Sequence, residues 1–192
     1  MTDTPEILVF AGPNGSGKST LAEAWDKTGL YINADDIKAK RGCTDLEAAQ
    51  EAERLRELCY SERYSFSFET VLSTERNLDL LFRAKSAGFH IESVFVLTVD
   101  AELNVFRVRS RELSGGHGVS PDKIRSRYTK SLDNISKLLA LSDVFRLVDN
   151  TSLPESLFIK DETGEQIRPN RYWTVEAIEK LTAMKENNHI FI

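Results

Sequence analysis

The chain has 192 residues, 41% of them hydrophobic, and a formal net charge of −5. This length suits one compact α/β domain across residues 1–192 and leaves little room for a second. The acidic balance argues against binding to nucleic acid or to anionic membranes. No long apolar stretch and no basic N-terminal start occur, so we expect a cytoplasmic protein. Cys43 and Cys59 lack the spacing of a metal or redox motif.

The first predicted strand, Glu6–Ala11, runs directly into a glycine-rich segment. This segment, Gly12-Pro13-Asn14-Gly15-Ser16-Gly17-Lys18-Ser19-Thr20, fits the pattern G-x-x-x-x-G-K-[ST]. Its glycines allow successive backbone amides to face phosphate oxygens at the start of a helix expected over residues 17–28. Lys18 is expected to reach the β- and γ-phosphates, and the Ser19 hydroxyl to bind Mg²⁺. The segment therefore predicts a binding site for a nucleoside triphosphate.

Strands and helices continue to alternate along the chain, which predicts a parallel sheet with helices on both faces. Further strands are expected at residues 30–32, 65–69, 90–99 and 144–148. Further helices are expected from residue 37 and at residues 45–63, 77–87, 101–113 and 121–141. Residues 155–187 are expected to form a small C-terminal hairpin and a closing helix.

The residues that follow parallel strands meet at one edge of the sheet, beside the phosphate-binding loop. After the second strand, Asp35 is placed to accept a proton from a hydroxyl aligned with the γ-phosphate. Asp35 and Asp36 both also qualify as helix N-caps. At the third strand, Glu69 and Thr70 are candidates for substrate or Mg²⁺ contacts, with a structural salt bridge as the alternative for Glu69. Asp100 follows the most hydrophobic strand, and we expect it to cap the next helix rather than to bind metal.

A basic segment interrupts the acidic sequence. From Arg107 to Lys130 there are seven basic and two acidic residues, a net charge of +5. Arg111 lies one helical turn after Arg107, and Arg125 and Arg127 follow on the next predicted helix. A planar guanidinium can contact two oxygens of a transferring phosphoryl group. Residues 107–130 therefore predict a helical lid over bound phosphates, and a solvated helical face is the alternative.

Four short motifs follow one another along the chain. They are Ala11 to Thr20, then Ile32-Asn33-Ala34-Asp35-Asp36-Ile37, then Phe68-Glu69-Thr70, then Gly115-Gly116-His117 with Arg125-Ser126-Arg127-Tyr128. This ordered set resembles the zeta-toxin family of P-loop kinases. The resemblance implies a P-loop NTPase three-layer sandwich whose five-stranded parallel sheet has the order 2-3-1-4-5. It also implies transfer of the ATP γ-phosphate, with Mg²⁺, to a sugar hydroxyl such as one on UDP-N-acetylglucosamine.

The resemblance also implies roles for individual residues. The family's catalytic base falls on Asp35 and its strand-end glutamate on Glu69. Its two lid arginines fall on Arg111 and on either Arg125 or Arg127. An antitoxin partner belongs to the family pattern, although no contact for it is readable in this sequence. The chain is shorter than the toxins, which leaves less room for the elements that grip a nucleotide sugar.

The sequence therefore predicts a small-molecule kinase that uses ATP and Mg²⁺. Two alternatives stay open: a nucleotide-dependent switch or ATPase that acts with a protein partner, and an antibiotic or nucleoside phosphotransferase. Residues 113–117 also resemble the signature of ABC-transporter ATPases, but the apolar run ending in Asp-Glu that must follow this signature is missing.

Overall fold

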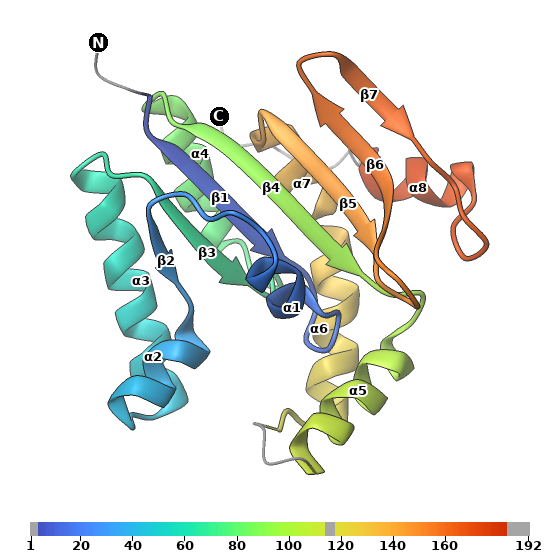
Figure 1. Ribbon diagram of the computed structural model, residues 1–192, viewed down its shortest axis with the longest axis horizontal. Helices are drawn as coiled ribbons and strands as arrows, with labels where there is room; N and C mark the ends of the chain where they lie inside the picture. Colours follow the sequence, from blue (N-terminus) through green and yellow to red (C-terminus); the bar gives the residue numbers. More distant parts are fainter. Residues whose placement is uncertain (1–3, 114–117, 184–192) are drawn as a thin grey trace.

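The computed structural model describes residues 4–113 and 118–183, which form a seven-stranded mixed sheet with helices on both faces (Figure 1). The strands are β1 (Glu6–Ala11), β2 (Leu30–Ile32), β3 (Phe66–Thr70), β4 (His90–Leu97), β5 (Val144–Asp149), β6 (Glu155–Asp161) and β7 (Gly164–Ile167). The helices are α1 (Lys18–Glu23), α2 (Ala34–Arg41), α3 (Asp45–Ser61), α4 (Arg76–Ser86), α5 (Ala101–Leu113), α6 (Pro121–Asp133), α7 (Ile135–Leu141) and α8 (Val175–Thr182).

The order of the strands across the sheet is β2-β3-β1-β4-β5-β6-β7. Strands β1 to β5 pair in parallel, whereas β6 pairs antiparallel to β5 and β7 antiparallel to β6. The sheet is therefore larger than the five-stranded parallel sheet expected from the sequence. The hairpin joins it because Leu157 and Phe158 are apolar and become buried, and the Phe158 ring packs edge-on against Phe145 of β5 with centroids 6.2 Å apart.

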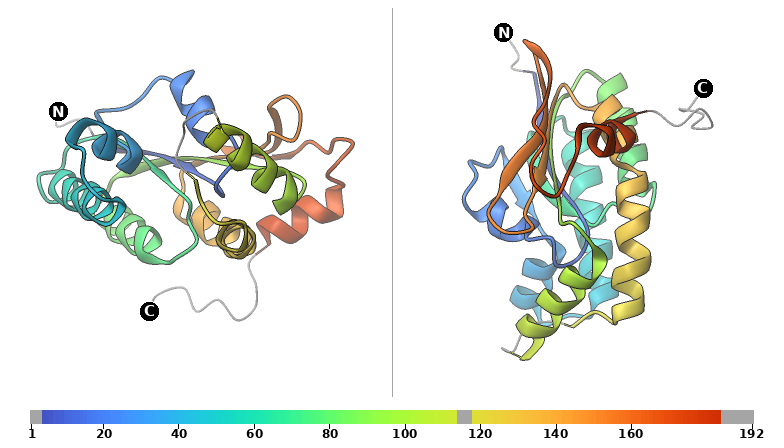
Figure 2. Two further views of the ribbon diagram at one scale, coloured as in Figure 1. Left: turned by 90° about the horizontal axis from the view of Figure 1, so that it is seen from below. Right: turned by 90° about the vertical axis from the view of Figure 1, so that its right-hand side faces the viewer.

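The two faces of the sheet carry different numbers of helices (Figure 2). Helices α3, α4, α7 and α8 contribute to the larger core cluster, which contains Phe66, Phe68 and Phe145. Helix α1 covers the other face, where its Ala22 joins Phe10 and Val96. Because the parallel strands all end at one edge, the loops after β1, β2, β3 and β4 gather there. Within the described residues, none of these helices has both the length and the apolar character that a membrane span requires.

Two predicted helices differ from those in the structure. Helix α1 ends at Glu23 and not near residue 28, and the helix expected over residues 121–141 is divided at Asn134. At this division, the Asn134 side-chain amide donates a hydrogen bond to the Leu72 carbonyl at 2.9 Å, and the Ser131 hydroxyl donates one to the Val71 carbonyl at 2.7 Å. These hydrogen bonds hold the end of α6 against the segment after β3. Such a long-range contact cannot be inferred from local helix propensity, which favours one continuous helix.

The burial of the hairpin predicts a large effect of Phe158→Ala on stability. Phe158 is 2% exposed, so its truncation should reduce the free energy of unfolding by about 3–5 kcal/mol. Urea unfolding followed by circular dichroism measures this change. Glu165→Ala, on the exposed part of β7, is the matched control and should change the free energy of unfolding by no more than about 0.5 kcal/mol. Equal effects of the two substitutions would show that the hairpin is not part of the core.

Candidate functional site

The glycine-rich loop lies between β1 and α1 and packs closely against its neighbours. Gly12 has φ 144°, and a Cβ atom there would lie 2.1 Å from the Val96 carbonyl oxygen. A Cβ atom on Gly15 would lie 2.6 Å from the Asn104 carbonyl oxygen. Only glycine fits such positions, and the loop is held directly against β4 and α5. The backbone of such a loop can bind a chain of phosphates, because its amide groups donate hydrogen bonds to phosphate oxygens.

Lys18 is the centre of a charged cluster. Burial lowers the pKa of Lys18, the carboxylates of Glu69 and Asp35 raise it, and the guanidinium groups of Arg111 and Arg127 lower it further. The structure thus brings together five residues that the sequence analysis selects from four separate segments. In such a cluster the three cations can bind a multiply charged anion, and a carboxylate can accept a proton.

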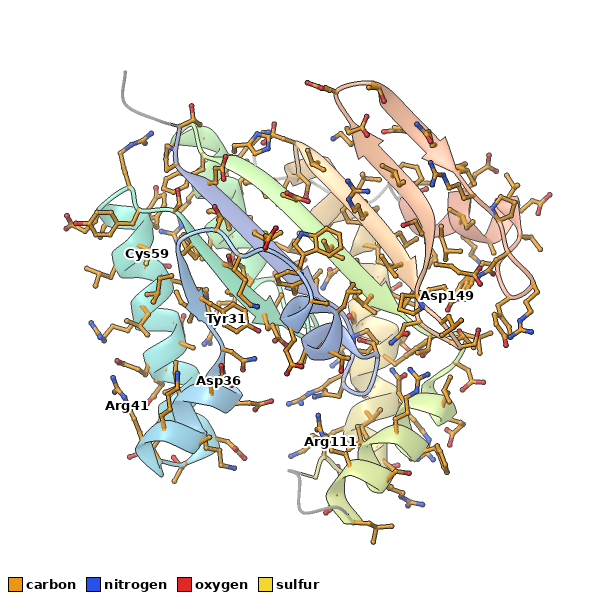
Figure 3. The ribbon with its side chains drawn as sticks, in the orientation of Figure 1. Tyr31, Asp36, Arg41, Cys59, Arg111 and Asp149 are labelled. Atoms are coloured by element: carbon orange, nitrogen blue, oxygen red, sulfur yellow. The ribbon has the colours of Figure 1, made fainter. Side chains whose placement is uncertain are left out.

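Two cavities lie on either side of this cluster. The larger, about 390 Å³, lies between the loop, α2, α3 and β3, and residues of each contribute to it. The smaller, about 210 Å³, is lined by Gly15, by residues 17–20 at the start of α1, and by Arg107 and Val108 of α5. Lys18 and Arg111 line both cavities, and Figure 3 shows Arg111 on α5 beside the space that separates this helix from α2. A group bound at Lys18 is therefore accessible from both sides.

Glu69 is held by three neutral donors. Its Oε2 accepts a hydrogen bond from the Ser19 hydroxyl at 2.6 Å, and its Oε1 accepts one from the Asn33 side chain at 2.8 Å and one from the Tyr31 hydroxyl. Burial and the bond to Glu69 raise the pKa of Tyr31, so the phenol stays a donor. Among the described residues Glu69 has no ion pair. Its position beside the loop is thus fixed without a salt bridge.

The Ser19–Glu69 pair fits a magnesium ion. The Ser19 proton is committed to Glu69, which leaves lone pairs of the hydroxyl oxygen for a metal. Hydroxyl and carboxylate oxygens are ligands that Mg²⁺ accepts, usually together with water and substrate phosphates. In the described part of the chain, no group of three or more His, Cys, Asp or Glu residues forms a metal site by itself. Mg²⁺ held here would therefore need phosphate oxygens as further ligands.

The structure separates the roles of Asp35 and Asp36. The N-cap of α2 is Asn33, whose side-chain oxygen accepts a hydrogen bond from the Asp35 amide at 2.8 Å, so the capping alternative for both aspartates is wrong. Asp35 lines the larger cavity, whereas Asp36 lines neither of the two cavities. Figure 3 shows Asp36 on α2, near Tyr31. Of this pair, Asp35 is the carboxylate that lines the larger cavity.

The structure also separates Arg125 from Arg127. Arg127 lines the larger cavity, and its Nη1 lies 3.4 Å from the Asn14 side-chain oxygen in the loop. Arg125 instead donates to Glu102 at 2.6 Å and to Asp122 at 3.1 Å, and it lines neither cavity. Of the two arginines, Arg127 is the one that reaches the phosphate-binding loop. Gly115, Gly116 and His117 of the fourth motif lie outside the described residues.

Two other strand-end residues have local roles. The Asp100 carboxylate accepts a hydrogen bond from the Leu103 amide at 2.8 Å, which confirms the predicted cap of α5. The Thr70 hydroxyl accepts hydrogen bonds from the Leu72 amide at 2.9 Å and from the Asn77 side chain at 2.8 Å. Thr70 nevertheless lines the larger cavity beside Glu69.

Sequence reasoning missed three residues of this site. Tyr31 and Asn33 orient Glu69, and Arg56 of α3 lines the larger cavity while being only 8% exposed. Asn33 stands within the motif that contains Asp35 and could have been selected from it. Arg56 carries no sequence signal, because arginine is common in helices and the sequence alone does not distinguish it from the exposed Arg54 on the same helix.

Comparisons with known proteins find a family model, a sequence relative and structures of the same fold. The family model described as Zeta toxin matches residues 1–170. A Haemophilus influenzae protein described as uncharacterized is 28% identical, over 64% of this chain and 92% of that protein. A chain of the PezAT chromosomal toxin–antitoxin system of Streptococcus pneumoniae has a TM-score of 0.61 at 18% identity, over 94% of this chain and 79% of that chain. A chain of the AvrRxo1-ORF1:-ORF2 complex with ATP has a TM-score of 0.71 at 17% identity, over 94% of this chain and 64% of that chain.

The two structural matches show that the fold is shared, and the family model covers most of the sequence, including the loop, Asp35, Glu69 and the lid arginines. The chain belongs to the zeta-toxin family of P-loop kinases.

Proposed function

We propose that this protein transfers the γ-phosphate of ATP to a hydroxyl group of a small sugar-like molecule. The observation that carries this proposal is that Lys18 and Arg111 line both cavities. ATP enters the smaller cavity, with its phosphates in the loop, and the acceptor enters the larger one. The two substrates then meet at Lys18, as direct transfer between them requires.

Each charged residue has a part in this reaction. Asp35, on the acceptor side, takes the proton from the attacking hydroxyl. Lys18, Arg111 and Arg127 neutralise the charge that spreads over the oxygens of the moving phosphoryl group. Mg²⁺ held by Ser19 would neutralise part of the negative charge of the β- and γ-phosphates. It would so weaken their electrostatic repulsion of each other and of the attacking oxygen. Glu69, fixed by Tyr31 and Asn33, orients the Ser19 hydroxyl for this contact.

The identities of the donor, the acceptor and a protein partner are proposed from similar proteins. The AvrRxo1 complex was crystallised with ATP, which supports ATP as the phosphate donor in this chain. A nucleotide sugar such as UDP-N-acetylglucosamine is the acceptor implied by the family, and Glu69 and Thr70, which line the larger cavity, are the proposed contacts. Asp36, the other candidate contact from the sequence, lines neither cavity and is left out of this proposal. The PezAT system contains an antitoxin, and we extend to this chain only the proposal that such a partner exists.

A screen of hydroxyl compounds tests the proposed reaction. The full chain is incubated with ATP and Mg²⁺ and with sugars, sugar acids, sugar phosphates, nucleotide sugars, nucleosides or aminoglycosides, and products are identified by mass spectrometry. A kinase consumes ATP only when an acceptor is present and yields a product heavier by one phosphoryl group. ATP hydrolysis that no acceptor accelerates, but that a protein partner does, would support the switch alternative instead.

Asp35→Asn should abolish transfer to the acceptor found in this way. Loss of a general base lowers kcat by about 10²–10⁴-fold, while ATP affinity should stay nearly unchanged because Asp35 lies on the acceptor side. Steady-state kinetics and ATP titration measure the two effects. Asp36→Asn is the matched control and should keep most of the activity. If the two variants have similar turnover, Asp35 is not the base.

Arg127→Gln and Arg125→Gln should differ in the same assay. An arginine that stabilises the transferring phosphoryl group is worth about 10³-fold or more in kcat, and Arg127 is the one that lines the cavity. Arg125→Gln removes only exposed ion pairs with Glu102 and Asp122, so its kcat should stay close to that of the unaltered protein. A larger loss in Arg125→Gln would reverse this assignment.

A further inference from the structure

One face of α3 forms a wall of the larger cavity. Asp45, Ala48, Ala49, Ala52 and Arg56 all line it, and their spacing of three or four residues places them on one side of the helix. From Asp45 to Arg56 the helix rises roughly 16 Å. The three alanines have short side chains and so leave space along this wall. The cavity is therefore a slot that extends along α3 from its first residue to Arg56.

Arg56 is a buried cation on this wall. The residue is 8% exposed, and its guanidinium lies 5.2 Å from the centre of the Phe68 ring. In the part of the chain that the structure describes, the guanidinium has no hydrogen bond and no ion pair. The contact with the Phe68 ring stabilises the guanidinium group, but it provides no acceptor for the N–H donors of this group.

The acidic neighbours of Arg56 on α3 are already paired with other arginines. Glu53 pairs with Arg76 at 2.8 Å, and Glu57 pairs with Arg83 at 2.5 Å. Burial lowers the pKa of Arg56, and the more distant charges of Glu53 and Glu57 raise it by less. An arginine remains protonated even so. The helix thus holds a buried positive charge whose nearest carboxylates are used elsewhere.

Arg56 is also separate from the cations assigned to phosphoryl transfer. Successive side chains of a strand point to opposite faces, so Phe68 and Glu69 leave β3 on opposite sides. Glu69 contacts Ser19 on the side of α1, whereas Arg56 stacks on Phe68 on the side of α3. Arg56 therefore lines a part of the cavity different from the part where Lys18 and Arg111 lie.

We propose that the acceptor carries, in addition to its reacting hydroxyl, a carboxylate or phosphate group that binds to Arg56. A buried, unpaired cation is unfavourable until an anion reaches it. The N–H groups of a guanidinium match the oxygens of a carboxylate or phosphate, and the contact with the Phe68 ring helps to hold this group in place. The cavity of about 390 Å³ lies at the small end of the range for ligand sites, which favours a compact acceptor such as a sugar acid or a sugar phosphate. The acceptor role rests on the proposed function, but the anion site does not.

Anion binding tests this proposal without any turnover. The full chain is first saturated with Mg²⁺ and a non-hydrolysable ATP analogue, so that the loop is filled. Inorganic phosphate and, separately, acetate are then titrated by calorimetry. We expect the unaltered protein to bind at least one of them, and Arg56→Gln to bind it about tenfold more weakly or worse, because charge-assisted hydrogen bonds are lost. Stronger binding of phosphate than of acetate indicates a phosphorylated acceptor, and the reverse order indicates an acid.

Two further variants serve as controls. Arg125→Gln removes an arginine that is paired outside the cavity, and it should bind the anions like the unaltered protein. Arg56→Lys keeps the charge but not the fork, and should weaken binding by a smaller factor if Arg56→Gln fails to fold. Analogue affinity reports the fold of each variant. Unchanged anion binding in the Arg56 variants, or none in the unaltered protein, overturns the proposal. A failed kinase screen alone would leave this result standing.

Discussion

The position of the partly buried Lys18 among groups of both charges is the constraint on which the rest of the site depends. The close approach of the glycine-rich loop to β4 and α5 fixes the start of α1, and so fixes where the Lys18 side chain lies. Burial disfavours its charged form, and two carboxylates and two arginines surround it. An incoming phosphate chain adds negative charge at the place where three cations meet. The free energy of binding phosphate therefore includes relief of the repulsion among them.

The carboxyl edge of the sheet connects this charged centre to the acceptor side. Tyr31 of β2 and Asn33, which follows that strand, donate hydrogen bonds that orient Glu69 of β3. Glu69 in turn accepts a hydrogen bond from Ser19 of α1. The same short turn after β2 starts α2 and places Asp35 in the larger cavity. A change in the turn after β2 would thus disturb both the proposed metal ligand and the proposed base. The anion site that we propose along α3 is the second such site, and the distance between the two sites would define the length of the acceptor.

The sequence was informative where chemistry requires a particular residue at a particular spacing. The glycine-rich loop and Asp35 could be found because a backbone cradle and a strand-end carboxylate have such requirements. Features that depend on distant contacts could not be found. Arg56 is proposed as a binding residue because its acidic neighbours pair with Arg76 and Arg83, which the sequence alone does not reveal. The same is true of the hairpin, whose edge pairing with β5 follows from burial of Phe158, and of the break between α6 and α7.

A crystal structure of the full chain with Mg²⁺ and a non-hydrolysable ATP analogue tests the central claim most directly. Our account predicts that the γ-phosphate contacts Lys18 and Arg111, that Mg²⁺ is bound by Ser19, and that the nucleoside lies in the smaller cavity beside Arg107. The part of the larger cavity that contains Asp35 and Arg56 should then hold no part of the nucleoside. A nucleoside found in the larger cavity, against α3, would contradict the assignment of that cavity to the acceptor.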